Sequence, residues 1–351
     1  MSRPSSAEQA AVRAFHERLL RWFEAHGRHD LPWQRPRTLY RVWVSEIMLQ
    51  QTQVVTVIGY FERFMRRFPT VQSLASAPLD EVLAHWSGLG YYARARHLHR
   101  AAQLIVASGR AQWPRTREGW TALPGVGEST AGAILAQALN QREPILDGNV
   151  KRVLTRVFAV AEPVTQAVDR LWELADRITP LERPADFTQA IMDLGATVCT
   201  LRRPLCERCP LSASCAGFKQ GDPTRYPVKS KAKAKRQVVK WWLILRTERA
   251  VYLEQRPAQG IWGGLWGFKE FESHRALLAF VEQVPKGDSG ALKPVAAKKH
   301  VLSHQTWDIH CFELKLLKKP TRLLPGSWVA HSDRDQRGLA APVAAILKAM
   351  V

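Results

Sequence analysis

Four cysteines within seventeen residues constrain this chain more than any other feature. Cys199, Cys206, Cys209 and Cys215 have the spacing C-x6-C-x2-C-x5-C, in a loop rich in proline and arginine. Four thiolates at this spacing can converge on one centre when the loop closes around it. Such a set binds either zinc or a 4Fe-4S cluster, and the spacing alone does not choose between them. The fifth cysteine, Cys311, lies in a strand pattern and is expected to be a core thiol.

Length and charge narrow the class of protein. The 351 residues are about twice the length of a typical domain, which predicts two domains. Lysine and arginine number 51 against 31 aspartate and glutamate, and the net charge of +20 favours nucleic acid as a partner over an anionic membrane. No apolar run approaches the ~20 residues that span a bilayer, and residues 1–10 lack the core of a secretory signal. We therefore expect no membrane contact and a cytoplasmic, nucleoid-associated protein without disulfides.

The first part of the chain reads as helical and the last part as mixed. Residues 8–216 form one predicted domain, whose amphipathic helices include residues 74–86, 91–107 and 168–178. Residues 225–240 hold seven basic and no acidic residues, and we place a basic linker over 217–238. The predicted second domain, 239–351, is α+β, with strands at 241–245, 251–255 and 306–316 and helices at 274–283 and 342–350.

A tight glycine-containing turn joins two predicted helices near the middle of the chain. Residues 123–127 read LPGVG, and an apolar helical pattern begins directly after them. Gly125 and Gly127 allow backbone conformations that side chains forbid, so their amide groups can approach a phosphate. The helix start at Ser129 adds positive potential to the same place. The alternative is an ordinary connection between helices.

Two acidic residues are candidates for chemistry. Asp147 follows Gly127 by twenty residues and precedes Gly148 and Asn149, so it can either cap a helix or face the sugar of a gripped nucleotide. The two roles are compatible. Glu46 stands on a predicted helix beside apolar residues, and a carboxyl in such company tends to keep its proton. The alternative for Glu46 is a glutamate on a solvent-facing helix surface.

Together, the LPGVG hairpin, Asp147 and the cysteine loop resemble the endonuclease III superfamily of DNA glycosylases. Three further segments make the chain similar to the adenine DNA glycosylase (MutY) family, namely LPW at 31–33, VWVSEIMLQQTQV at 42–54 and GLGYYARAR at 88–96. The resemblance implies a mainly α, helix-hairpin-helix glycosylase domain with an iron-sulfur cluster loop. It also implies one 4Fe-4S cluster on the four cysteines.

The resemblance implies a reaction and a role for each acid. The family hydrolyses the N-glycosidic bond of adenine mispaired with 8-oxoguanine or guanine, after the base is flipped out of the duplex. Glu46 would donate a proton to adenine, Asp147 would stabilise the oxocarbenium-like sugar, and Asn149 would order the site. The implied partner is double-stranded DNA with an A:8-oxoguanine or A:G pair, bound by a monomer.

The resemblance also assigns DNA contacts. Gly125, Gly127 and Ser129 would hold the backbone, Gln51 and Thr52 would probe the duplex, and Tyr91 would wedge beside the base opposite adenine. For Tyr91 and its neighbour Tyr92 the alternative is core packing.

The second domain resembles the Nudix-like domain of the same family, most clearly at residues 260–267, GIWGGLWG. A hydrolytic Nudix domain needs a downstream cluster of glutamates that binds metal. No such cluster follows Glu272 in this chain. We therefore expect recognition of 8-oxoguanine, by Ser303 and His304. Leu302 stands before them where the family has phenylalanine.

Two other functions compete with this interpretation. A bifunctional lyase on the same fold would need a lysine on the hairpin helix to form a Schiff base, and this chain has Ser129 there. A non-catalytic DNA-binding protein with a zinc-held loop would give Glu46 no role and would be colourless.

Overall fold

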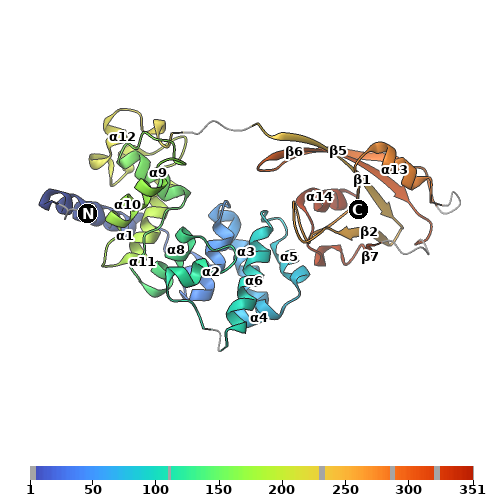
Figure 1. The fold of residues 1–351 in the computed structure, drawn as a ribbon, viewed down its shortest axis with the longest axis horizontal. Coiled ribbons are helices and arrows are strands. Elements are labelled where there is room, and N and C mark those ends of the chain that lie inside the picture. Colours follow the sequence, from blue (N-terminus) through green and yellow to red (C-terminus); the bar gives the residue numbers. More distant parts are fainter. Residues whose placement is uncertain (1–4, 110–111, 229–233, 285–288, 320–324, 351) are drawn as a thin grey trace. The chain divides into compact units, whose positions relative to one another are not determined.

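The computed structural model describes residues 5–109, 112–228, 234–284, 289–319 and 325–350 (Figure 1). Its contacts divide the chain into two units, Met1–Gln72 with Arg100–Lys231 and Ser73–His99 with Ala232–Val351. The domain limits expected from the sequence, 8–216, 217–238 and 239–351, stay a prediction. Residues 229–233 of the expected linker lie outside the described residues.

The first unit is helical, as predicted. Its longer helices are α1 (Ser6–His26), α2 (Leu39–Leu49), α3 (Val54–Arg67), α7 (Arg117–Thr121), α8 (Glu128–Leu139), α9 (Gly148–Val157), α10 (Val168–Ile178) and α11 (Pro184–Asp193). Shorter turns are η1 (Pro32–Gln34), the π-helical η2 (Leu194–Val198), η3 (Cys206–Arg208), η4 (Ser212–Ser214), α12 (Ala216–Lys219) and η5 (Pro223–Arg225). Among the described residues, no helix is long and apolar enough to cross a membrane.

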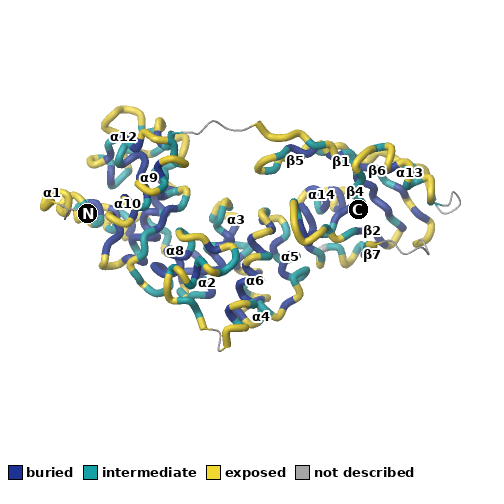
Figure 2. The backbone as a smooth tube through the Cα atoms, in the orientation of Figure 1, coloured by how far each residue is buried: buried dark blue, intermediate teal, exposed yellow. Residues whose placement is uncertain are grey.

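Helical periodicity explains the core of this unit. In α10 the buried residues Leu171, Leu174, Ala175 and Ile178 recur at the spacing of one helix face. They join one apolar cluster with residues of α1, α9 and α11. Figure 2 shows the result, with buried segments of α8 and α9 inside the unit and an exposed start to α1. This core holds the ends of α2, α8 and α9 on which the candidate site is built.

The second unit contains a seven-stranded sheet with the order β3-β2-β1-β6-β5, in which β4 also pairs with β1 and β7 with β2. The strands are β1 (Arg236–Arg246), β2 (Ala250–Gln255), β3 (Trp266–Gly267), β4 (Lys269–Phe271), β5 (Lys293–Val301), β6 (Gln305–Lys315) and β7 (Ser327–Ala330). Strands β1 and β6 are parallel, and the other named pairs are antiparallel. Helices α13 (His274–Val281) and α14 (Ala341–Ala349) and the turn η6 (Arg334–Gln336) complete the predicted α+β character.

Two local predictions were wrong. The helix expected over 74–86 is two helices, α4 (Val71–Ser76) and α5 (Leu79–Trp86), because Pro78 has no amide hydrogen to continue the first. The basic linker expected over 217–238 overlaps β1, which begins at Arg236 within the same basic stretch. There the β-branched Val238 and Val239 pair in parallel with Trp307 and Asp308, so strand pairing outweighs the local charge.

The segment 73–99 packs with the sheet rather than with the helices that flank it in sequence. It contains α4, α5 and the first residues of α6 (Ala93–Ala107). Asp80 accepts hydrogen bonds from Trp266 Nε1 at 2.9 Å and from Arg337 Nη1 at 3.0 Å. The Tyr92 hydroxyl donates to the carbonyl of Leu339 at 2.8 Å. Tyr92 is therefore buried in packing, which is one of the alternatives raised for it.

We predict that Asp80→Ala lowers the free energy of unfolding by about 1–2 kcal/mol, because it leaves the Trp266 indole and Arg337 without this acceptor. Asp80→Asn keeps an oxygen for Trp266 and should lose less. Urea unfolding of the full chain measures both. Equal stability of both variants and the wild type would show that this contact does not stabilise the unit.

Candidate active site

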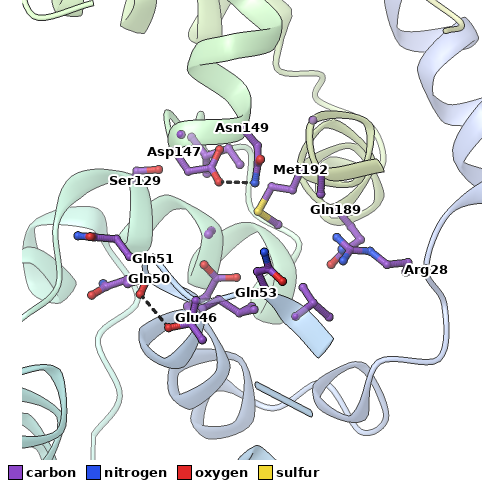
Figure 3. A pocket seen from close by; sticks show the side chains of 18 of the residues that line it. Arg28, Glu46, Gln50, Gln51, Gln53, Ser129, Asp147, Asn149, Gln189 and Met192 are labelled. Atoms are coloured by element: carbon purple, nitrogen blue, oxygen red, sulfur yellow. Dashed lines mark hydrogen bonds between the residues drawn. The ribbon is translucent and has the colours of Figure 1, made fainter. Parts of the chain in front are cut away.

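A pocket of about 810 Å³ opens in the first unit, between the ends of α2, α8, α9 and α11. It brings Glu46 together with Asp147 and Asn149, which lie far from Glu46 in the sequence. Figure 3 shows Glu46 on one side of the pocket and Asp147 with Asn149 on the other. Other predicted residues that line it are Gln51, Thr52 and Ser129.

Glu46 comes from the last turns of α2, a helix whose other residues are almost all buried. Thr38 caps the start of this helix by accepting from the amide of Arg41. Burial raises the pKa of Glu46 to about 7, and the nearby charge of Asp147 adds to the rise, whereas a hydrogen bond from Gln137 opposes it. The carboxyl therefore keeps its proton near neutral pH, as expected from its apolar neighbours.

Asp147 caps a helix, which is one of the two roles that its sequence position allowed. It is the N-cap of α9 and accepts from the amide of Val150 at 2.7 Å, while it also lines the pocket. Burial raises the pKa of Asp147, and the bonds from Val150 and Asn149 and the charge of Arg152 oppose the rise. The start of α9 adds a favourable dipole for the ionised form.

Asn149 is fixed from both ends of its amide. Its Nδ2 donates to Asp147 Oδ2 at 3.2 Å (Figure 3), and its Oδ1 accepts from Arg152 Nη2 at 2.8 Å. Gly195 in η2 lies against it so closely that an added Cβ would be 2.6 Å from the Asn149 Cβ. A glycine at 195 is therefore needed for this arrangement.

The predicted hairpin is present between α7 and α8. Gly125 has a φ of +79°, which a side chain would disfavour, and Gly127 caps α8 with open space around its α-carbon. Ser129 has a second, structural part: its hydroxyl accepts from the amide of Leu146 at 2.9 Å. This bond ties the hairpin helix to the residue before Asp147.

Several residues that line the pocket were not predicted from the sequence. Arg28 forms an ion pair of 2.5 Å with Asp193, and Gln189 donates to the same carboxylate at 2.8 Å. Asp193 and Gln189 are one turn apart on α11 and both are buried, and a pair of polar residues at this spacing was the signal available in the sequence. The pocket also contains Trp33, Leu49, Gln50 and Met192.

Three predicted DNA contacts belong to the second unit. Tyr91 is 49% exposed and has a φ of +49°, so the chain presents its ring from a strained turn. Ser303 and His304 are exposed at the tip of the hairpin between β5 and β6.

The four cysteines line one small cavity together with Arg156. Arg156 is 1% exposed and donates to Cys199 Sγ at 3.2 Å and to the carbonyl of Thr200 at 2.7 Å. Burial is the main cause that raises the pKa of the Cys206, Cys209 and Cys215 thiols. Among the described residues, no three His, Cys, Asp or Glu side chains lie close enough to hold a single metal ion.

Comparisons with known proteins show the family to which the chain belongs. The chain matches the HhH-GPD superfamily of base excision DNA repair proteins over residues 44–177 and the NUDIX domain over residues 240–349. The adenine DNA glycosylase of Buchnera aphidicola subsp. Schizaphis graminum is 35% identical over 342 residues, 96% of this chain and 99% of that protein. The adenine DNA glycosylase of Homo sapiens is 40% identical over 315 residues, 74% of this chain and 58% of that protein.

A solved thermostable thymine-DNA glycosylase has a TM-score of 0.57 and 27% identity, and covers 61% of this chain and 100% of its own. The chain thus combines a helix-hairpin-helix glycosylase fold and a Nudix-like domain with a relative that matches it nearly end to end. The chain belongs to the adenine DNA glycosylase family and is a base excision repair enzyme that removes adenine.

Proposed function

We propose that this enzyme removes adenine paired with 8-oxoguanine or guanine in duplex DNA, as a monofunctional glycosylase. One observation carries the proposal: a carboxyl that keeps its proton, Glu46, shares a pocket with a second carboxyl at a helix start, Asp147. At about 810 Å³, the pocket is in the size range of small-molecule sites and can accept a flipped base.

The two carboxyls divide the chemistry. Glu46 donates its proton to a ring nitrogen of adenine, so the bond from the sugar to the base breaks with its electron pair on the base. The sugar then carries positive charge, which the ionised Asp147 stabilises across the pocket. Water adds to the sugar carbon and gives up one proton, which restores the acid. The bond from Asn149 and the start of α9 both favour the charged form of Asp147 that this step needs.

Two polar side chains of the pocket that were not predicted from the sequence could form hydrogen bonds with a purine base. Gln189 and Arg28 line the same pocket, and both are held by the buried Asp193. Amide and guanidinium groups fixed in this way can read the edge of a base by hydrogen bonds. The Ser129 hydroxyl cannot form a Schiff base, which supports hydrolysis without a lyase step.

Exposed residues support the proposed DNA contacts. The open backbone at Gly127 and the start of α8 suit a phosphate, and the charge of +20 favours duplex DNA of any sequence. Tyr91 is available as a wedge, and Ser303 and His304 are available to hydrogen-bond the base opposite adenine.

We further propose that Cys199, Cys206, Cys209 and Cys215 hold a 4Fe-4S cluster, which orders the loop that follows η2. Four cysteines around one cavity, with a buried arginine donating to one sulfur, fit such a group. Tetrahedral zinc needs its four sulfurs tightly clustered at 2.3 Å from one ion, whereas a cluster spreads them over different irons. The spacing suits either group, and the resemblance to the iron-sulfur loop of the endonuclease III superfamily favours the cluster.

Glu46→Gln and Asp147→Asn should each reduce single-turnover excision of adenine by about 10³-fold, which is roughly 4 kcal/mol of transition-state stabilisation. Each removes a proton or a charge used only as the bond breaks, so duplex affinity should stay near that of the wild type. Glu173→Gln, at an exposed position on α10 outside the pocket, is the matched control. Excision by either variant at the wild-type rate would remove that residue from the mechanism.

The double variant Ser303→Ala, His304→Ala should lower the preference for 8-oxoguanine over guanine by tens of fold, since each lost polar contact is worth ~1–3 kcal/mol. Excision opposite guanine is the internal control. Point changes are preferable to truncation here, because the segment 73–99 packs with the strands that truncation would remove. An equal loss on both substrates would contradict a role in recognition.

The purified protein should contain about four iron atoms and four acid-labile sulfides per chain and be brown. Cys206→Ser should lose iron and destabilise the loop. A colourless protein with one zinc per chain would contradict the cluster.

A further inference from the structure

One buried amide in the first unit has no part in the mechanism above. Gln137 lies on α8 and is 4% exposed, among the buried apolar residues Ile134, Leu135 and Ala136. Burying a side-chain amide costs free energy unless it is hydrogen-bonded, and leucine would fit such a helix face better. A buried amide at this position therefore needs a hydrogen-bond partner.

That partner is the candidate acid. Gln137 Nε2 donates to Glu46 Oε1 at 2.9 Å, across the direct packing of α2 against α8. The two residues are 91 positions apart in the sequence. Among the described residues, Gln137 is the one that forms a hydrogen bond with the Glu46 carboxyl.

We propose that Gln137 is a positioning residue for the catalytic acid: it occupies one oxygen of the Glu46 carboxyl and leaves the other oxygen to carry the proton. This inference rests on the proposed function of Glu46. An amide N–H can only donate, so the proton of the neutral acid belongs on Oε2. The same bond stabilises the ionised form, so it keeps the acid strong enough to release its proton in spite of burial.

Few other charges face Glu46. In the pocket they are Asp147, Arg152 and Arg28, and Arg28 is already paired with Asp193. Helix α8 contributes Glu128 at its exposed first turn, and η1 contributes no charged side chain. The charged residues of α2 and α3 are Arg41, Glu62, Arg63, Arg66 and Arg67. Burial and Asp147 both favour neutral Glu46, so Gln137 is the group that opposes them.

The direct test is the titration of Glu46 in the DNA-free, full-length protein. Glutamate labelled with ¹³C at the carboxyl is followed by NMR, and Glu46→Gln identifies the signal. In Gln137→Leu and in the similarly shaped Gln137→Met, the pKa of Glu46 should rise by about one unit, because a hydrogen bond to a charged group is lost. Ile134→Leu, a substitution at a buried position on the same helix, is the matched control and should leave the pKa of Glu46 unchanged.

The second readout is the pH dependence of single-turnover excision. Its alkaline limb should move to higher pH in Gln137→Leu by the same amount as the NMR titration. If neither variant changes the Glu46 titration, Gln137 only packs and the inference is overturned. If the titration moves and the alkaline limb does not, Gln137 acts as inferred and the proposed role of Glu46 as the acid is wrong.

Discussion

The candidate site depends on one unfavourable burial, that of the Glu46 carboxyl between α2 and α8. Burial makes the charged form costly and raises the pKa of Glu46 to about 7. An ordinary surface glutamate would be ionised and could not serve as an acid at neutral pH. In the proposed reaction the apolar packing of α2 therefore has a chemical role, because it raises the pKa of Glu46, and the hydrogen bond from Gln137 opposes that rise.

The opposite side of the pocket is held by a chain of hydrogen bonds that begins at Asp147. Asn149 bonds Asp147, Arg152 bonds Asn149, and Arg152 also donates to the carbonyls of Gly195 and Cys199. The cysteine loop is thus joined physically to the second carboxyl. A disturbed loop should therefore displace Asp147 as well as lose the proposed cluster, which would give that cluster a structural role in the proposed reaction.

Much of the fold and of the candidate site could be predicted from short stretches of the sequence. A few neighbouring residues were enough to recognise Glu46, Asp147, the hairpin glycines and the cysteine spacing. The structure places Glu46 and Asp147 in one pocket. What the sequence did not predict depends on partners far along the chain. Gln137 matters because it meets Glu46, 91 positions away, and the segment 73–99 joins the sheet through Trp266, Arg337 and Leu339. The periodic pattern of apolar residues predicts helices and strands, but it does not predict contacts between side chains so far apart in the sequence.

The central claim is that the folded protein holds Glu46 neutral, and the stability of wild type and Glu46→Gln across pH tests it most directly. The pKa is about 7 in the folded state against 4.5 for the ordinary group, so wild-type stability is retained below pH 4.5 and lost as pH rises to 7. The stability of Glu46→Gln relative to wild type should therefore increase across this window by on the order of 3 kcal/mol and level off above it. A difference that stays constant from pH 4.5 to 8 would contradict the account.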